Sequence, residues 1–409
     1  MDDSMSGTVG SELPPRLAIV SGIPAGDSGT GRFVAHLASR IAELGQGRIK
    51  IVAKPERPAR WQFQLWLKSK NYGRIAREAV RYAQLISRFW IEVGLVLANP
   101  KRQLILLHPQ NLGYDLALRL LESRSSPSLL YLLDSSFFCV ASYNHLKGEA
   151  GPCLRCLELG FEQVAAQGCR PFPRPDPAGL GFAPRLRRLT TSGKVKIAAQ
   201  NQRQAALAQR QFGLALEPPV VGLWTSDWDD IFAGASAAEG TPTVAPNFAW
   251  DVVFHGYGVD AKGANWTVQL AEQCPELRFM FPFAKPVSMA APDNCSFLPC
   301  SWETGLSEEL SRARFVAVPS LWSAPIEGAL IKSIAAARAT LVVDNATSYC
   351  DELPAGLVLK LPPDPATAAM RLRQAIEEDW VPDPDVKAAW KTAFSAIKAR
   401  FVPDLLATV

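Results

Sequence analysis

A chain of 409 residues is long enough for two domains, each with its own hydrophobic core. With 48% hydrophobic and 20% charged residues, the composition is that of a globular protein, which excludes a fibrous or disordered chain. The formal net charge of +4 is too small to indicate nucleic-acid binding, so no nucleic-acid partner is expected.

The sequence shows no obvious targeting or membrane-spanning segment. Its first fifteen residues are polar and acidic and lack the apolar centre of a signal peptide. The longest apolar stretch, residues 83–99, is interrupted by Arg88 and Glu92 and is a poor candidate for a transmembrane helix. These patterns predict a cytosolic protein, in which the cysteines are expected to be reduced.

A glycine-containing loop follows the first predicted strand, residues 16–21, and precedes an apolar helix. Two of its glycines have the separation of a Walker A motif, but Arg32 replaces the lysine and Phe33 replaces the hydroxyl residue that holds magnesium. A P-loop nucleotide hydrolase is therefore disfavoured. Gly29 and Gly31 indicate either a turn that requires glycine or a loop where a substrate approaches the helix N-terminus.

The next predicted strand, residues 48–53, is followed by a basic segment with many bulky side chains, residues 57–88. One explanation is a pair of helices with a core-facing side and a solvated basic side. The other is a surface that rests on an anionic bilayer, with Trp and Phe inserted between Lys and Arg. Both explanations stay open. The side chains concerned include Arg60, Trp61, Phe63, Trp66, Lys68, Lys70, Arg74, Arg77 and Arg81.

Two further predicted strands, residues 103–108 and 129–134, end in His108 and Asp134 respectively. In an open α/β sheet, the carboxyl ends of parallel strands face the ligand-binding cleft. A histidine after an apolar strand is equally often a hydrogen-bonded structural group. The sequence therefore marks both residues as candidates and leaves their role open.

Four of the eight cysteines fall in one loop-rich segment: Cys139, Cys153, Cys156 and Cys169, with a CxxC pair at its centre. Thiolate pairs on turns are how structural zinc sites are built, so the pattern predicts a structural zinc ion and no catalytic metal. Four thiols without metal and an iron–sulfur cluster are the alternatives. His145 could substitute for one cysteine.

The middle of the chain predicts a strand at residues 194–199, a helix at 202–212 and a strand at 219–223. Residues 232–247 are small, polar and proline-bearing, and form the best linker in the chain. A second domain is expected to begin after them.

The first strand of this second domain, residues 251–255, leads into a turn that contains Gly256, Lys262 and Gly263. A lysine in such a turn is often only a solvated charge. Its place between glycines after an apolar strand favours a phosphate-binding turn.

Residues 315–345 contain a buried strand, a loop, an apolar helix and a second buried strand, which together predict a βαβ unit and a parallel sheet. The loop at 320–327 would then lie beyond the carboxyl ends of the strands, where ligands bind. Glu327 is its one carboxylate. Helices at 366–378 and 386–401 are expected to close the chain.

The last two segments resemble the donor site of glycosyltransferases with two Rossmann-like domains, the GT-B architecture, and in particular the retaining "group 1" family. Pro319 and Ser320 match the family pattern, as do the glycines and lysine of the turn after residue 255. The two glutamates of the family fall on Ala324 and Lys332, and Tyr257 stands where an arginine is expected.

The resemblance implies an α/β fold of two Rossmann-like domains across a cleft, with a cysteine-rich insertion in the first. It also implies sugar transfer from a nucleotide-sugar to a glycan or lipid-linked acceptor, with retention, as in bacterial-type surface polysaccharide or glycoconjugate synthesis. The alternative is a catalytically silent relative that binds a nucleotide-sugar, a glycan or a partner protein. Because the resemblance puts an acid at position 332, Lys332→Glu would restore that acid and need not be damaging.

The resemblance also assigns roles and boundaries. The implied catalytic residues are His108, Asp134 and Glu327; the implied donor-binding residues are Gly256, Lys262, Gly263, Ser320, Glu327, Gly328 and Lys332; Gly29 and Gly31 would line the acceptor side. The predicted units are a disordered terminus 1–14, an acceptor domain 15–235 with an insertion at about 139–175, a linker 236–248, a donor domain 249–385 and a helix 386–409 that crosses back. A cytoplasmic protein, in peripheral contact with the inner face of an anionic membrane, would fit this scheme.

Overall fold

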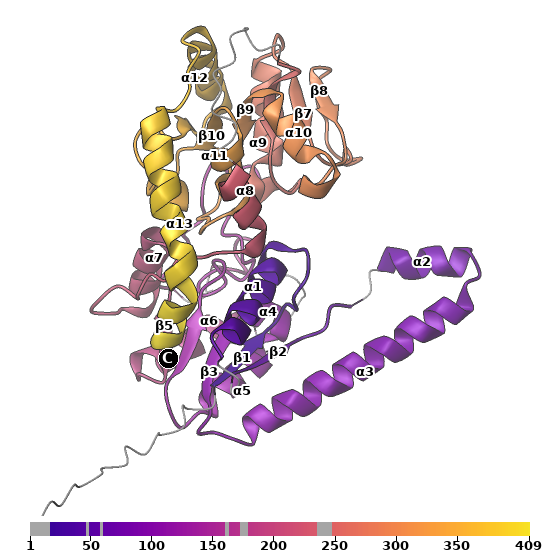
Figure 1. Cartoon of the computed structure of the whole chain (residues 1–409), viewed down its shortest axis with the longest axis vertical. Helices are drawn as coiled ribbons and strands as arrows, with labels where there is room; N and C mark the ends of the chain where they lie inside the picture. The colour runs from indigo at the N-terminus through magenta and orange to yellow at the C-terminus, as the bar shows by residue number, and fades with distance from the viewer. Residues whose placement is uncertain (1–16, 46–48, 58–59, 160–162, 172–178, 235–247) are drawn as a thin grey trace, which may run out of the picture.

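The protein contains two α/β domains, each built on one parallel sheet (Figure 1). This computed structural model describes residues 17–45, 49–57, 60–159, 163–171, 179–234 and 248–409. The predicted disordered terminus and all of the predicted linker except Phe248 lie outside the described residues.

The first sheet has the strand order β2-β1-β3-β4-β5, with every neighbouring pair parallel. Both of its faces are covered, because alternate side chains of one strand enter different clusters: Ala18 and Val20 join one core, Leu17 and Ile19 another. The strands are β1 (Leu17–Ser21), β2 (Lys50–Ala53), β3 (Gln103–Leu107), β4 (Ser128–Tyr131) and β5 (Val195–Ala198). The helices around them are α1 (Gly29–Glu43), α4 (Pro109–Leu112), α5 (Tyr114–Glu122), α6 (Gly179–Thr191) and α7 (Gln202–Phe212).

The second sheet has the order β11-β10-β9-β6-β7-β8 and is also parallel throughout. Its strands are β6 (Trp250–Phe254), β7 (Phe279–Phe281), β8 (Cys295–Phe297), β9 (Ala313–Ala317), β10 (Thr340–Val343) and β11 (Leu359–Leu361). The helices are α9 (Ala264–Gln273), α10 (Leu306–Ser311), α11 (Gly328–Ala336) and α12 (Pro365–Glu377). The predicted βαβ unit is confirmed as β9, α11 and β10, with β9 and β10 paired in parallel.

The last helix, α13 (Pro384–Ala407), runs from the second domain down the side of the first (Figure 1). Near its end Phe401 packs against Phe33 of α1 and Tyr131 of β4, with ring centroids 5.7 and 6.1 Å apart. Further up, Phe394 stacks on Trp390. One hydrophobic cluster therefore continues from the first sheet through α13 to α11 of the second domain.

The predicted strand at 219–223 is wrong: the structure has only an isolated bridge between Ala199 and Val220 there. β4 also stops at Tyr131, so Asp134 lies in the following loop. The sequence missed β11, a three-residue edge strand that is too short to show a periodic pattern.

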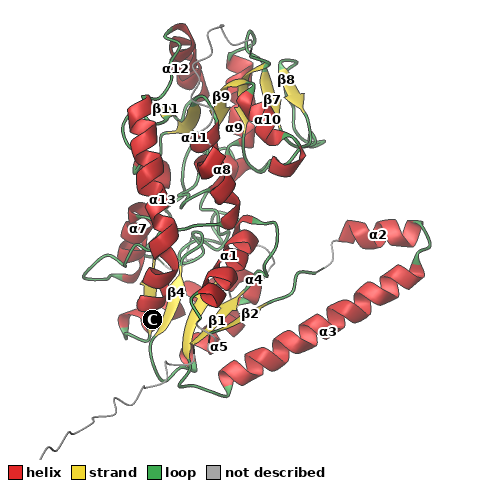
Figure 2. Ribbon diagram, viewed as in Figure 1, coloured by secondary structure: helices red, strands yellow, loops and turns green. Residues whose placement is uncertain are grey.

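The basic segment forms two helices, α2 (Arg60–Lys68) and α3 (Tyr72–Leu97), which project from the first domain as an arm (Figure 2). Only the last turns of α3 reach the core, where Phe89, Val93 and Val96 are buried in the same cluster as Val52 of β2. Among the described helices, none carries an apolar stretch long enough to cross a bilayer.

Candidate functional site between the two domains

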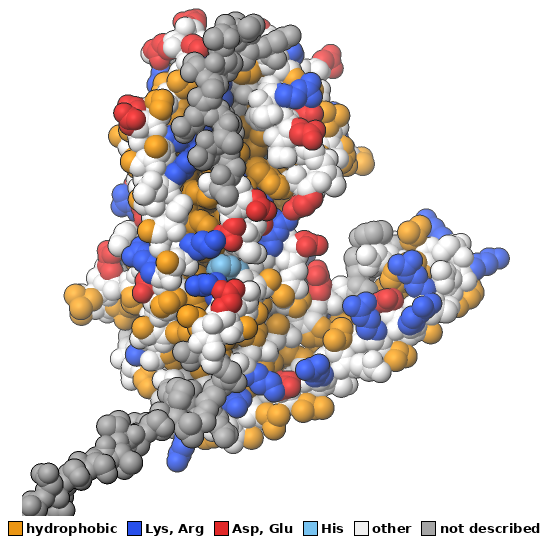
Figure 3. Space-filling model, viewed as in Figure 1, with side chains coloured by type: hydrophobic (Ala, Val, Ile, Leu, Met, Phe, Trp, Pro, Cys, Tyr) orange, Lys and Arg blue, Asp and Glu red, His pale blue; other side chains and the backbone are white. Residues whose placement is uncertain are grey.

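The loops after the strands of both sheets meet between the domains. Contacts cross from one domain to the other at Arg32 with Glu303, Lys332 with Asp227 and His145 with Asp260. Figure 3 shows basic and acidic side chains gathered where the two domains join. Polar groups from both domains thus face one another at this junction, which is where an α/β protein binds its ligands.

Lys262 and Glu327 form an ion pair between the loops that follow β6 and β9 of the second domain. Lys262 ends a short 3₁₀ turn (Asp260–Lys262), and the next residue, Gly263, has φ +78°. A Cβ at Gly263 would lie 2.1 Å from the Pro319 carbonyl oxygen, so only glycine lets the β6 and β9 loops pack this closely. That packing brings Lys262 to Glu327 and places its ammonium 4.7 Å from the centre of the Trp322 ring.

Glu327 stands immediately before α11, whose first backbone N–H groups point toward the same loops. Ser320 and Trp322 are both buried, and within the described part of the chain the Ser320 hydroxyl and the Trp322 indole nitrogen have no hydrogen-bond partner. Buried polar atoms without partners are uncommon and need a reason, and binding of a ligand or water is one such reason. The arrangement offers a cation, a helix N-terminus, a carboxylate and free hydrogen-bonding groups within one set of loops. Gly256 and Gly328 lie in the same loops.

Lys332 lies apart from that ion pair, in a second charged cluster. Its ammonium is 2.7 Å from Asp227 and 4.6 Å from the centre of the Trp302 ring. Arg32 of α1 also bonds Asp227, at 2.8 Å, and Glu303 at 2.7 Å. Burial opposes ionisation of Asp227, but its bonds to Lys332 and Arg32 keep the pKa of the carboxyl below its usual value.

The contact with Asp227 changes the expectation for Lys332→Glu, which should now be unfavourable. The new carboxylate would lie against Asp227, with Glu303 nearby, where like charges repel. Asp227 and Arg32 were not assigned to this cluster by sequence, because they come from the first domain and from the segment that precedes the linker.

His255, which follows β6, is a site residue that the sequence did not mark. It is buried, its Nδ1 lies 2.8 Å from the Ser333 hydroxyl, and its ring stacks on Trp302. Burial, with a smaller effect of Lys332, lowers the pKa of His255 to about 3. A neutral imidazole therefore separates the sheet from the charged cluster.

The structure brings His108 and Asp134 together in the loops after β3 and β4 of the first domain. The His108 Nε2 lies 3.8 Å from Asp134 and 3.3 Å from the side-chain nitrogen of Gln110, which also bonds Asp134. Burial lowers the pKa of His108, although Asp134 opposes the shift. Its Nδ1 has no partner among the described residues. A neutral histidine with a free nitrogen can accept a proton, so Gln110 completes a candidate acceptor site.

Packing requires glycine at two positions of the loop before α1: a Cβ at Gly22 would lie 2.2 Å from the His108 carbonyl oxygen, and Gly31 is similarly crowded. A Cβ at Gly31 would lie 2.8 Å from the Gly26 carbonyl oxygen, whereas one at Gly29 would meet nothing within 4 Å. The Ser28 hydroxyl caps the helix by accepting the Gly31 N–H at 3.1 Å. A turn that requires glycine therefore explains Gly31. Gly29 is not crowded, so its glycine is not explained by packing.

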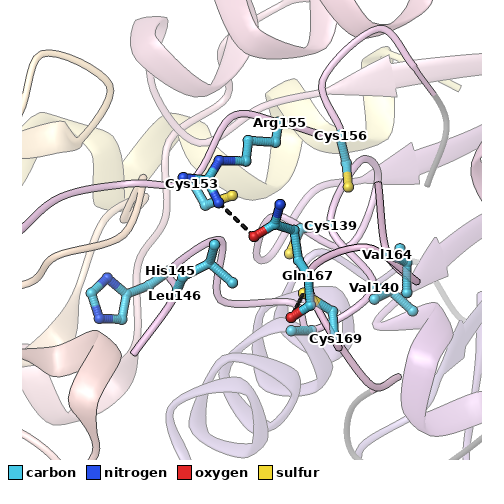
Figure 4. A pocket seen from close by; sticks show the side chains of 11 residues that line it. Cys139, Val140, His145, Leu146, Cys153, Arg155, Cys156, Val164, Gln167 and Cys169 are labelled. Atoms are coloured by element: carbon cyan, nitrogen blue, oxygen red, sulfur yellow. Dashed lines mark hydrogen bonds between the residues drawn. The ribbon is translucent and has the colours of Figure 1, made fainter. Parts of the chain in front are cut away.

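Cys139, Cys153, Cys156 and Cys169 line one small cavity of about 20 Å³ (Figure 4). All four are free thiols, and in the described residues no group of three or more His, Cys, Asp or Glu side chains is arranged to hold a metal ion. Burial raises the pKa of Cys139, Cys156 and Cys169, which keeps these thiols protonated. The His145 ring turns toward the Gly151 carbonyl and Asp260.

No protein-family model matches the sequence, and no curated protein is significantly similar to it. Solved structures do match. Sucrose-phosphate synthase from Thermosynechococcus elongatus has a TM-score of 0.58 at 14% identity, covering 96% of this chain and 100% of its own. Anabaena HepE in complex with UDP gives 0.55 at 12% identity, covering 96% and 98%.

A further match is alpha,alpha-trehalose 6-phosphate synthase from Burkholderia multivorans, with a TM-score of 0.53 at 14% identity, covering 96% and 99% of the two chains. These matches extend over nearly the whole chain, so they compare both domains and their connection. The protein therefore has the GT-B fold, with two Rossmann-like domains facing each other.

The buried histidines predict how stability depends on pH. Burial lowers the pKa of His36, His108 and His255, so between pH 7 and pH 5 the unfolded chain binds more protons than the folded one. The free energy of unfolding should fall as pH falls, by up to roughly 1.4 kcal/mol per pH unit for each histidine that stays neutral. Urea unfolding at pH 7, 6 and 5 measures this slope. His255→Asn should make it shallower; an unchanged slope would contradict the assignment.

Proposed function

We propose that the protein transfers a sugar from a nucleotide-sugar to an acceptor bound between its two domains. The supporting observation is the Lys262–Glu327 pair, which lies before the N-terminus of α11 beside the unpartnered Ser320 hydroxyl. Cations and helix N-termini together are how folds of this kind bind phosphate groups. Among the structural neighbours, HepE was solved with UDP and with UDP-glucose.

In this scheme Lys262 and the α11 N–H groups stabilise the negative charge of the departing diphosphate. Glu327, released from Lys262 when the phosphate arrives, accepts hydrogen bonds from the sugar hydroxyls. Stabilisation of the leaving group on the donor side is the main catalytic effect, and loss of such a group typically costs ~10²–10³ in rate. His108, Asp134 and Gln110 face the acceptor. Retention of configuration and a hexose donor follow the resemblance of the loops to the group 1 enzymes.

The acceptor class in this proposal is a glycan or a lipid-linked glycan, in surface polysaccharide or glycoconjugate synthesis on the cytoplasmic side of a membrane. A catalytically silent protein with the same binding site is the second candidate. Lys332 and Ala324, at the two positions where the family has acids, favour it. Release of nucleoside diphosphate in the presence of donor and acceptor separates the two candidates, since a silent relative binds the donor without turnover.

Lys262→Ala tests the donor site. We expect nucleotide-sugar binding to weaken by ~1.5–3 kcal/mol, because a charge-assisted hydrogen bond to phosphate is lost. Isothermal calorimetry with UDP-glucose, and then other nucleotide-sugars, measures the change. Lys360→Ala is the matched control: it removes a lysine that bonds Asp351 at 2.7 Å on strand β11 of the same domain. Equal affinities in wild type and Lys262→Ala would remove Lys262 from the donor site.

We further propose that the four cysteines hold one structural zinc ion, because all four line the same cavity. Zinc would bind them as thiolates, so loading releases protons and should weaken at low pH. Metal analysis of protein purified without chelators should give about one zinc per chain, and less in Cys153→Ser and Cys156→Ser. Cys295→Ser, in the second sheet, is the control. A metal-free wild type, or mutants with full metal, would contradict the proposal.

The arm is proposed to rest on an anionic membrane. Five apolar side chains of α2 and α3 are 53–65% exposed: Leu65, Val80, Trp90, Ile91 and Leu95. Val80, Ile91 and Leu95 lie on one side of α3, since spacings of eleven and four return to the same face. The exposed Arg77, Arg81 and Arg88 flank that side. Apolar side chains next to arginines suit the interface of a negatively charged bilayer.

The sequence-based choice of Trp61 and Trp66 as inserted residues needs revision. Trp66 is buried and packs against Phe63, with Arg74 over its ring. The side chain of Trp61 lies outside the described residues.

Liposome co-sedimentation tests the arm. Wild-type protein should pellet with vesicles that contain phosphatidylserine, less with neutral vesicles, and less as salt is raised. Ile91→Gln with Leu95→Gln should reduce pelleting several-fold, because less apolar area enters the bilayer. Leu216→Gln, which changes a leucine that is 81% exposed on another surface, is the control. If the protein pellets equally with neutral and anionic vesicles, or does not pellet at all, the membrane proposal fails. Helix packing would then be the remaining explanation of the basic aromatic residues in α2 and α3.

A further inference from the structure

The cysteine loop of the first domain reaches across and touches the donor loops of the second. Three consecutive residues, Tyr143, Asn144 and His145, make these contacts, and they lie between Cys139 and Cys153. We call this tripeptide the clasp. The Tyr143 ring meets the Trp322 ring at 4.7 Å in an edge-on arrangement and lies 5.4 Å from the Lys262 ammonium. The Lys262–Glu327 pair is thus covered from the first domain.

Asn144 is the centre of the clasp, because its side chain makes all the hydrogen bonds that a carboxamide can make. Its Oδ1 accepts from the Ser135 hydroxyl and from the Ser323 N–H, both at 2.9 Å. Its Nδ2 donates to the Ser323 hydroxyl at 2.9 Å and to the Cys153 carbonyl at 3.2 Å. The residue is fully buried.

These four bonds join the two ends of the local loop, each nine residues from Asn144, to a segment 179 residues away. Ser135 follows Asp134 on the acceptor side, Cys153 belongs to the cysteine cavity, and Ser323 lies in the loop that leads from Trp322 to Glu327. The Asn144 carbonyl also accepts the Cys153 N–H at 2.6 Å. A fully satisfied buried network of this kind fixes one geometry, and removal of one member leaves the others unpaired.

His145 adds a contact with the turn that carries Lys262. Its Nε2 lies 3.4 Å from Asp260, the first residue of the turn that carries Lys262, and its Nδ1 lies 3.1 Å from the Gly151 carbonyl. The clasp therefore touches both loops that supply the ion pair: the β6 loop through Asp260 and the β9 loop through Ser323.

We propose that Asn144 is a positioning residue of the donor site, through which the cysteine loop of the first domain holds the Ser323 backbone and so sets affinity for the nucleoside diphosphate. This inference rests on the proposed function for its ligand. Its structural content, that the 320–327 loop is held from the other domain, can be tested without any ligand.

The ligand-free test is hydrogen–deuterium exchange of residues 320–327 in the full chain. Asn144→Ala should raise exchange there at least several-fold, because the Ser323 N–H loses its acceptor. Asn294→Ala is the matched control: the same substitution removes three hydrogen bonds to the carbonyls of Ala271, Cys274 and Leu277, all inside the second domain. It should leave exchange at 320–327 as in wild type.

The ligand test is calorimetry with UDP and with GDP. Asn144→Ala and Ser323→Ala should each weaken binding about fivefold to tenfold. The double variant should bind about as weakly as Asn144→Ala, because Asn144→Ala already removes both bonds to Ser323, whereas Ser323→Ala removes only the bond to its hydroxyl. Ser323→Ala also covers the case in which Asn144→Ala fails to fold, since it leaves the first domain unchanged.

The outcomes separate the two ideas. Unchanged exchange at 320–327 in Asn144→Ala, or fully additive losses of affinity, would overturn the clasp. If wild type binds neither nucleotide while exchange responds as expected, the clasp stands and the proposed donor site falls. If Asn144→Ala and Asn294→Ala raise exchange at residues 320–327 equally, the cause is a general loss of stability. That result would also overturn the clasp proposal.

Discussion

The arrangement of this protein depends on one cluster of aromatic rings that fastens the two domains together. Phe394 of α13 has its ring centroid 5.2–5.7 Å from those of Trp390, Trp224, Trp228 and Phe232. Burial of such large side chains contributes more than any exposed ion pair in the junction, because apolar area removed from water stabilises in proportion to its size. The domains can therefore present charged loops to each other without depending on them for cohesion.

Each positive side chain of the junction lies beside a carboxylate, so the opposite charges largely neutralise each other. Lys262 is paired with Glu327, and Lys332 shares Asp227 with Arg32. A single buried charge would cost several kcal/mol, so each cation keeps a carboxylate beside it. A phosphate group can replace Glu327 next to Lys262 at little electrostatic cost, because it also carries negative charge. The Lys332 cluster has two cations for Asp227 and is better read as a bridge between α1 and α11.

The site draws on both domains more than the usual division into donor and acceptor halves suggests. Tyr143 and Asn144 belong to the first domain in sequence but pack on the loops of the second domain. Asn144 also bonds Ser135, next to Asp134. A change in the cysteine loop can therefore reach both halves of the site through one buried side chain, without movement of the sheets.

The sequence by itself determined the local parts of this structure. The apolar runs and their spacing predicted the βαβ unit of β9, α11 and β10, and the glycines around Lys262 predicted a close turn after β6. These signals are local, since strand burial, helical periodicity and turn chemistry act over a few residues. The GT-B fold followed from the resemblance of those loops, and the solved neighbours agree with it.

Only the tertiary structure decided which distant residues meet. It paired Lys332 with Asp227, placed Gln110 between His108 and Asp134, and set Asn144 against Ser323, 179 positions away. It also separated the exposed side of α3 from its buried side and buried Trp66, whose environment the sequence had left open. Such contacts depend on how whole domains pack, and packing across long separations leaves no periodic pattern in a single sequence.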